Sequence, residues 1–158
     1  MAITLVAVLL AVGTSIGAGY WAYVNLLYPQ TGRGNCFVLA PKNCISLSRD
    51  YVERELIGSP LPEVVTIETS GSRATLKSRE EWALLRSVNI SDFDRLPGSV
   101  AESGATPSVP PTELLDKGFT EVTRKLLLSD DSGNYTLSYT GIDKRGQTLA
   151  YVLRFHDL

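Results

Sequence analysis

The sequence is short of the side chains on which most catalytic and metal sites depend. It has one histidine, His156, and two cysteines, Cys36 and Cys44. A first-row metal site would therefore need carboxylates, and no spacing of Asp or Glu indicates one. The serines lack a nucleophile elbow, and no phosphate loop or dinucleotide fingerprint is found. We therefore expect no catalytic residue, no metal and no cofactor, and a protein that is not an enzyme.

Charged side chains are absent from the start of the chain. Residues 2–28 contain no Asp, Glu, Lys or Arg. About 20 helical residues cross a hydrocarbon core of about 30 Å, and only a helix pairs all its backbone groups internally in lipid. The sequence therefore predicts a transmembrane helix within residues 1–28 and a single-pass membrane protein, with membrane lipid as one partner.

Aromatic residues gather at the end of this apolar segment. Rings with one polar end suit the headgroup level of a bilayer, so they are expected to form an interfacial belt. The belt residues are Tyr20, Trp21, Tyr23 and Tyr28. A cleaved signal peptide and a buried core helix fit less well, because no basic side chain precedes the apolar run and the run has no polar face.

Small residues follow one another along the same segment. Gly13 and Gly17 form a G-x-x-x-G pattern, which lets two helix backbones approach closely. The pattern predicts packing against transmembrane subunits of a complex or, alternatively, against a second copy of this chain. The expected packing positions are Ala7, Ala11, Gly13, Ser15, Gly17 and Gly19.

The side of the membrane on which the rest of the chain lies is left open by two opposing signals. Basic residues after the span, Arg33, Lys42 and Arg49, favour a cytoplasmic domain. Cys36 and Cys44 favour an oxidising, extracytoplasmic compartment if they form a disulfide. Two unpaired thiols buried as small apolar groups are the equal alternative.

The remaining chain divides into a connector, residues 29–45, and a small domain, residues 46–158. A helix over residues 49–57 is expected after a cap at Ser46 or Ser48, and a hairpin over residues 63–77 turns at Gly71. Ser78 and Glu81 form a capping-box pattern that predicts a second helix. Residues 89–111 read as a long loop rich in Ser and Pro, and residues 113–117 as a short helical turn.

The C-terminal part has the clearest strand pattern. Residues 119–128, 135–142 and 148–155 are expected to form a three-stranded meander, with alternating side chains on the last strand. The predicted fold class is α+β: an N-terminal transmembrane helix, then a domain with an antiparallel sheet, made of the hairpin and the meander, and two or three short helices.

The remaining titratable groups are assigned ordinary surface roles. A lone histidine at a strand end, such as His156, is usually a surface residue. Glu53, Glu55, Glu80 and Glu81 are taken as helix-surface or capping carboxylates. The net charge of −2 gives no sign of a nucleic-acid surface.

Three functions remain as hypotheses. The first is a non-catalytic accessory or structural subunit of a larger membrane complex, of the energy-transducing or secretion type. The second is a membrane-tethered binding module, which is homodimeric if Gly13 and Gly17 pair with a second copy. The third is a membrane-anchored enzyme that uses His156 and a carboxylate.

Overall fold

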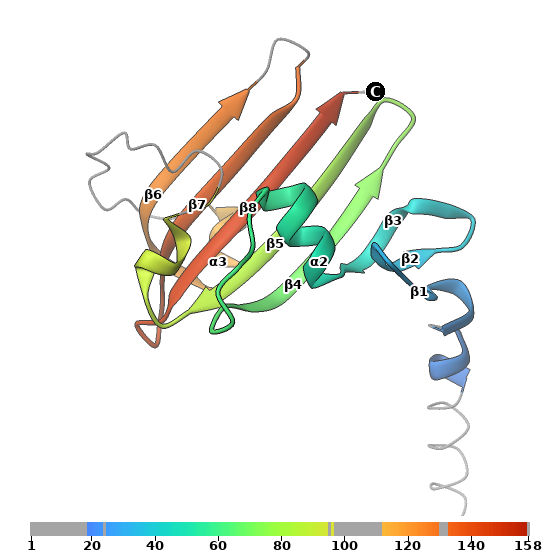
Figure 1. Ribbon diagram of the computed structural model, residues 1–158, viewed down its shortest axis with the longest axis horizontal. Coiled ribbons are helices and arrows are strands. Elements are labelled where there is room, and N and C mark those ends of the chain that lie inside the picture. The colour runs from blue at the N-terminus through green and yellow to red at the C-terminus, as the bar shows by residue number, and fades with distance from the viewer. Residues whose placement is uncertain (1–18, 24, 95, 97–111, 130–132, 158) are drawn as a thin grey trace, which may run out of the picture.

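A computed structural model of the chain describes residues 19–23, 25–94, 96, 112–129 and 133–157. These residues form one antiparallel sheet of eight strands, in the spatial order β1-β2-β3-β4-β5-β8-β7-β6 (Figure 1). The strands are β1 (Gln30–Thr31), β2 (Gly34–Phe37), β3 (Ala40–Leu47), β4 (Thr66–Ala74), β5 (Ser78–Ser87), β6 (Phe119–Ser129), β7 (Tyr135–Asp143) and β8 (Thr148–Asp157).

The helices of the described chain are short. Besides the helical residues 19–23 and 25–27, they are α2 (Arg49–Tyr51), the π-helix η1 (Val52–Ile57), the 3₁₀ helix η2 (Ile90–Phe93) and α3 (Thr112–Leu115). The helix expected over residues 49–57 is present as α2 followed by η1. It begins at Ser48, whose hydroxyl accepts the Tyr51 N–H, and ends at Gly58, which has the positive φ of 80° that favours glycine.

The predicted fold class is wrong, because the described chain is a sheet-rich domain of eight antiparallel strands with few short helices. The membrane span is corrected as well. Among the described residues no helix is both long enough and apolar enough to cross a bilayer, which contradicts the predicted single-pass membrane location. Residues 1–18, which carry most of the predicted span, lie outside the described residues.

The predicted helix after Ser78 is wrong, because Ser78–Ser87 is the central strand β5. In an extended chain, Trp82 and Leu84 project to one face of the sheet, and Ala83 and Leu85 to the other. Both sets contact apolar clusters, so both faces of this strand are covered. Burial on two faces removes the alternation of polar and apolar residues, and the capping-box pattern then suggested a helix.

The hairpin predicted over residues 63–77 is also misplaced. Thr66–Ala74 runs as one strand through Gly71, and the reversal comes later, between Ala74 and Ser78. The Thr75 hydroxyl accepts the Ser78 N–H at 3.0 Å, and the Thr75 N–H donates to the Ser78 carbonyl at 2.8 Å. Gly71 instead gives space for the Trp82 ring, since a Cβ there would lie 2.4 Å from Cζ2 of that ring.

Three strands predicted near the C-terminus are present as β6, β7 and β8. Their register places Leu137 opposite Leu153 and Tyr139 opposite Tyr151. The apolar stripes on β7 and β8 therefore meet on one face, as the alternation in the sequence indicated. The connector expected over residues 29–45 holds β1, β2 and most of β3.

The sheet separates two apolar clusters. On the face that we call the helix face, η1 and η2 pack over the middle of the sheet, and Leu56 and Phe93 lie in one cluster with Ala83 and Val152. On the opposite face, Leu114 of α3 packs with a second cluster. Figure 1 shows η1 and η2 in front of the sheet and α3 behind it. Helices on both faces explain why the central strands β5 and β8 are buried on both sides.

Candidate functional site

A buried carboxylate lies at the centre of the helix face. Glu81 projects from β5, and only 1% of its side chain is exposed. Its Oε1 accepts hydrogen bonds from the Arg33 and Arg79 guanidinium groups and from the Tyr51 hydroxyl, the last at 2.7 Å. Arg79 also donates to the Tyr51 hydroxyl. We call Glu81, Arg33, Tyr51, Arg79 and His156 the Glu81 cluster.

The Glu81 cluster joins three separate parts of the chain. Arg33 comes from the turn between β1 and β2, and Tyr51 comes from α2 above the sheet. The Arg33 guanidinium also stacks over the Tyr51 ring, 4.8 Å from its centroid. These contacts fix the N-terminal hairpin and the helix to β5.

Electrostatics keep the Glu81 carboxylate ionised. Burial raises its pKa, but hydrogen bonds from Arg79 and Tyr51 and the charges of Arg79 and Arg33 outweigh burial. The net pKa therefore lies below the ordinary value of 4.5. The same carboxylate and burial raise the pKa of the Tyr51 hydroxyl, so Tyr51 stays protonated and donates.

His156 lies at the edge of this cluster. The expected surface position is only partly right, since 29% of the His156 side chain is exposed and its Nε2 is 3.6 Å from Glu81 Oε2. Burial lowers the pKa of the imidazole below 6.5, and the charges of Arg79 and Arg154 add to this, against the opposing effect of Glu81. His156 is therefore mainly neutral near pH 7.

The chemistry of the Glu81 cluster favours binding over proton transfer. A general base needs a carboxylate or imidazole whose pKa lies near the working pH and whose lone pair faces a substrate. The pKa of Glu81 is lowered below its ordinary value, and three donors occupy its Oε1. The histidine and carboxylate of the enzyme hypothesis are thus adjacent, but the carboxylate is already used as a structural acceptor.

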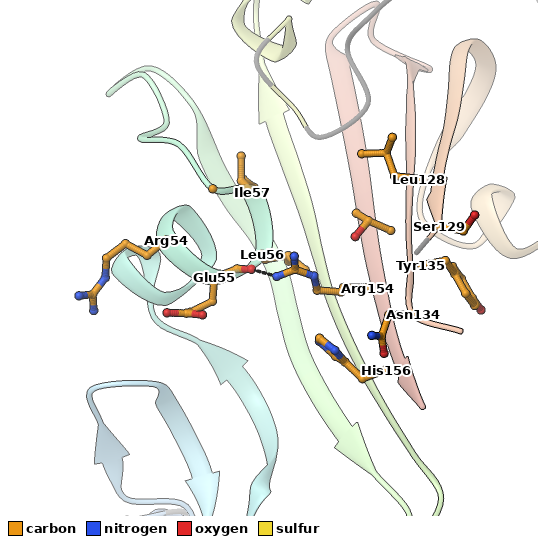
Figure 2. Close-up of a pocket in the computed structure, with 12 residues that line it drawn as sticks. Arg54, Glu55, Leu56, Ile57, Leu128, Ser129, Asn134, Tyr135, Arg154 and His156 are labelled. Atoms are coloured by element: carbon orange, nitrogen blue, oxygen red, sulfur yellow. Dashed lines mark hydrogen bonds between the residues drawn. The ribbon is translucent and has the colours of Figure 1, made fainter. Parts of the chain in front are cut away.

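A groove opens beside the Glu81 cluster, between the end of η1 and the ends of β6, β7 and β8. It has a volume of about 520 Å³. Figure 2 shows Arg154 and His156 on β8 lying between the helix and the sheet, while the side chains of Arg54 and Glu55 point away from it. One Arg154 N–H donates to the Glu55 carbonyl.

A second group of charges lies at the opposite end of the sheet. Arg86 of β5 bonds Glu68 at 2.9 Å, and it also bonds Asp143 and Gln147. Burial raises the pKa of Asp143, but the Arg86 bond and the backbone N–H groups of Gln147 and Arg145 lower it more. These pairs fix the β7–β8 turn to β5.

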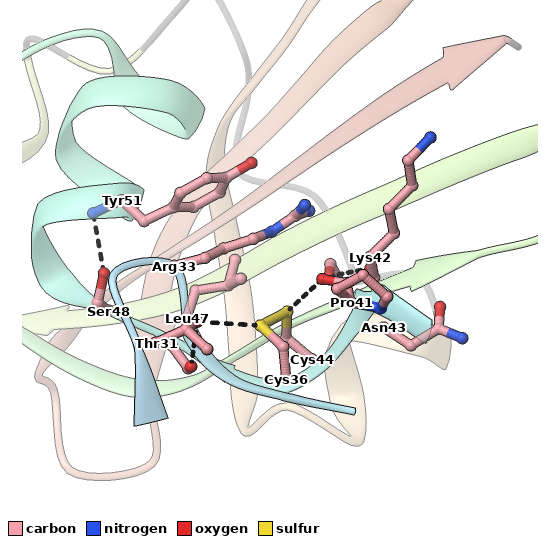
Figure 3. The surroundings of a disulfide bond; sticks show 12 residues. Thr31, Arg33, Cys36, Pro41, Lys42, Asn43, Cys44, Leu47, Ser48 and Tyr51 are labelled. Carbon is pink, nitrogen blue, oxygen red and sulfur yellow. Dashed lines mark hydrogen bonds between the residues drawn. A yellow bond between two sulfur atoms is a disulfide. The ribbon is translucent and has the colours of Figure 1, made fainter. Parts of the chain in front are cut away.

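The two cysteines form a disulfide that links β2 to β3 (Figure 3). Their Cα atoms face one another in the sheet register, and both residues are buried beside Leu47. Of the two alternatives left open by the sequence, the structure has the disulfide.

The expected helix-packing and belt residues fall largely outside the site. Ala7, Ala11, Gly13, Ser15 and Gly17 lie outside the described residues.

Gly19, Tyr20, Trp21 and Tyr23 belong to a helical segment, and the Tyr20 side chain is 71% exposed. Tyr28 packs against the Phe37 ring, with centroids 5.4 Å apart. These contacts bring none of the belt residues to Glu81.

Sequence reasoning missed Glu81, Arg33, Tyr51 and Arg154 as members of one site. Residues 79–85 carry no signal of period two, because apolar residues lie on both faces of β5, and only the extended backbone places Arg79 and Glu81 on one face with Ala83. The partners from other elements have no such signal either, since their meeting depends on how the strands pair.

The described residues contain no group of three or more His, Cys, Asp or Glu side chains that could hold a metal ion. Comparison of the chain with protein-family models, curated proteins and solved structures gave no match. No family or relative therefore supports the expected place in a membrane complex.

Proposed function

We propose that this chain is a non-catalytic binding module that holds an extended segment of another polypeptide against strand β6. The observation that carries the proposal is the outer edge of β6. This strand ends the sheet, and no described strand pairs with its far side. An open edge offers backbone N–H and C=O groups to an added strand.

The two halves of β6 differ in regularity. Register shifts occur between Phe119 and Glu121 and between Val122 and Arg124, whereas pairing with β7 is continuous from Arg124 to Ser129. Bulges protect an edge from pairing, because they bend it and interrupt the ladder. The second half therefore has the geometry that an incoming strand needs.

Apolar side chains mark the same half of β6. The residues Leu127 and Leu128 are 60% and 49% exposed, and they project to opposite faces of the sheet. A regular edge with exposed leucines is a site of aggregation unless another chain covers it. This supports binding of a polypeptide that supplies both backbone pairing and apolar contacts.

A substitution at the edge tests the proposal. Leu127→Glu places a charge where the bound segment would lie, and it should abolish retention of a partner when the tagged chain is isolated from cells that express it. Leu76→Glu is the matched control, since Leu76 is fully exposed in the β4–β5 turn. Equal retention of the same partner by both variants would contradict the proposal.

The oligomeric state separates this function from self-association. If a second copy occupied the edge, the purified chain would have twice its mass of 17.2 kDa, and Leu127→Glu would return it to a monomer. A monomer before and after the substitution, together with loss of the partner, supports binding of a different polypeptide. The expectation that the chain serves a larger assembly stays a prediction.

A further inference from the structure

Positive charge exceeds negative charge around the groove. Four charged or titratable side chains form a square on the helix face, because Arg79 pairs across strands with His156, and Glu81 with Arg154. Arg33 is a further cation at the same carboxylate. Among the described residues, the buried Nε atoms of Arg33 and Arg79 have no hydrogen-bond partner. One carboxylate therefore balances several cations.

Arg154 is the cation of this square that no described carboxylate pairs with. A guanidinium has five N–H donors, and its one described hydrogen bond goes to the Glu55 carbonyl. The acidic side chain of Glu55 points away from the groove, and Arg54, which also points away, pairs with Asp50 (Figure 2). Arg154 thus presents most of its donors to the groove.

The surroundings of Arg154 suit a carboxylate. Thr136 lies directly opposite it on β7, and His156 lies two residues further on the same face of β8. An arginine fork binds a carboxylate through two parallel hydrogen bonds. Leu128 and Ser129 of β6 line the same groove, so a segment paired with β6 passes beside it.

We propose that the groove binds the carboxylate of an acidic side chain carried by the polypeptide segment that pairs with β6, with Arg154 gripping that carboxylate and His156 beside it. This inference rests on the proposed function and specifies the chemistry of its ligand. The groove volume of about 520 Å³ holds more than one side chain. The ligand class is therefore an extended acidic peptide.

The test is titration of the isotopically labelled full chain with an acetylated and amidated tetraglutamate peptide, followed by NMR. Tetraglutamine is the uncharged control. We expect tetraglutamate to shift the amides of Thr136, Arg154 and His156, and tetraglutamine to leave them unchanged. No shift with tetraglutamate, or equal shifts with both peptides, would overturn the inference.

Variants locate the binding group. Arg154→Gln should weaken tetraglutamate binding at least about tenfold, because a hydrogen bond to a charged group is lost. Arg154→Lys, which keeps the charge without the fork, should bind with intermediate affinity. Arg145→Gln removes an exposed arginine from the β7–β8 turn and should leave binding unchanged. Equal losses for Arg145→Gln and Arg154→Gln would overturn the inference.

His156 gives a second readout, because it is the one histidine of the chain. Its ring faces Glu81, Arg79 and Arg154. A bound carboxylate should raise its pKa, whereas loss of fold in a variant would return the pKa to the ordinary value without any dependence on peptide. A pKa that does not change with tetraglutamate would contradict binding beside this ring.

Two further experiments distinguish a peptide ligand from a small acid, and failure of the carboxylate site from failure of the proposed β6 function. Glutarate that binds as tightly as tetraglutamate would show a small-acid site and overturn the peptide ligand. If Arg154→Gln retains the cellular partner while Leu127→Glu loses it, the carboxylate site fails and the β6 proposal stands. If Leu127→Glu also retains the partner, the proposed function itself fails.

Discussion

At the scale of single residues, one carboxylate connects the N-terminal turn, the helix α2 and the centre of the sheet. Glu81 compensates the charges of Arg33 and Arg79 in a place that water scarcely reaches. Removing one partner of such a buried group leaves the other charges unbalanced, which costs more than the ion pair itself contributes. Glu81 therefore contributes more to stability than the helix-surface or capping carboxylate that the sequence predicted would contribute.

We expect Glu81→Gln to lower the free energy of unfolding by about 3 kcal/mol, because the two arginines lose their counter-charge while the side-chain volume is kept. Urea unfolding measures this as a lower midpoint. Glu80→Gln is the control, since Glu80 is the neighbouring residue and is exposed. Equal midpoints for the two variants would show that Glu81 is not the centre of the cluster.

The pH dependence of stability has a defined sign at His156. Its pKa in the folded chain lies below the unfolded value of 6.5, so the unfolded chain takes up a proton first as the pH falls. Stability is therefore full above pH 6.5 and declines below it, until the pH passes the folded pKa. The lowered pKa of Glu81 adds a separate loss at more acid pH, below 4.5.

We expect His156→Gln to remove the first of these losses. Urea midpoints of the wild type should fall between about pH 7 and about pH 5.5, and those of His156→Gln should fall less over the same interval. Parallel curves for the two proteins would contradict the lowered pKa of His156.

The sequence predicted a surface position for His156, left the state of the two cysteines open, and assigned Glu81 to a helix surface or cap. A carboxylate that follows Ser-Arg-Glu has the same local pattern at a helix start and in a strand. Only the pairing of β5 with β8 brings Arg154 and His156 beside it. Contacts between residues so far apart in the chain leave no local signal.

At the scale of elements, the sheet depends on bulges and close approaches that glycine permits. In β7, Gly141 pairs with Val122, between the two register shifts of β6. A Cβ at this glycine would lie 2.0 Å from the Glu121 carbonyl oxygen and 2.9 Å from Cδ1 of Phe119. The Glu121 carbonyl belongs to the backbone of β6, so it cannot move aside as easily as the end of a flexible side chain.

We expect Gly141→Ala to destabilise the protein by about 2 kcal/mol, through displacement of the bulge. Thermal unfolding measures the loss. Gly32→Ala is the control, because a Cβ at Gly32 meets nothing within 4 Å. If Gly141→Ala has the melting temperature of the wild type, β6 accommodates the added methyl group without loss of stability, which would contradict this prediction.

The disulfide between β2 and β3 closes a short loop, with a sequence separation of 8 residues. By the loop-entropy relation, its loss should cost about 2–3 kcal/mol. We expect a reductant to lower the urea midpoint of the wild type, and to leave that of the Cys36→Ser and Cys44→Ser double variant unchanged. If the urea midpoint of the wild type is the same before and after complete reduction, the disulfide does not make this contribution to stability.

The strands β6, β7 and β8 were predictable, because turn residues separate them in the sequence and apolar side chains alternate in β7 and β8. The alternation in β8 also indicated which side chains meet β7. The strand β5 was mistaken for a helix because both of its faces are buried, and β4 was divided because Gly71 looked like a turn. In both cases the tertiary packing outweighed the local pattern.

At the scale of the whole molecule, the two ends of the sheet are unequal. The end strand β1 has two residues, whereas β6 at the other end has eleven, of which the six from Arg124 to Ser129 continue in regular register and include exposed leucines. A short edge strand resists pairing with other chains, and a long regular one favours it. The asymmetry supports the proposal of a binding surface at β6, next to the groove that holds Arg154.

Neither the number of strands nor the edge at β6 could be derived from the sequence. The strands β1 to β3 are short or irregular, and their pairing depends on a disulfide that the sequence left open. The apolar start of the chain predicted a membrane span, but the described residues contain no helix that is long enough and apolar enough to cross a bilayer.

Hydrogen exchange along β6 tests the central claim most directly. The chain should be measured alone and in complex with the polypeptide that it retains in cells, and peptides covering Lys125–Ser129 compared with those covering β1. We predict slower exchange in the β6 peptides upon binding and unchanged exchange in β1, because an added strand pairs the outward backbone groups. Unchanged exchange in β6 within a stable complex would contradict the account.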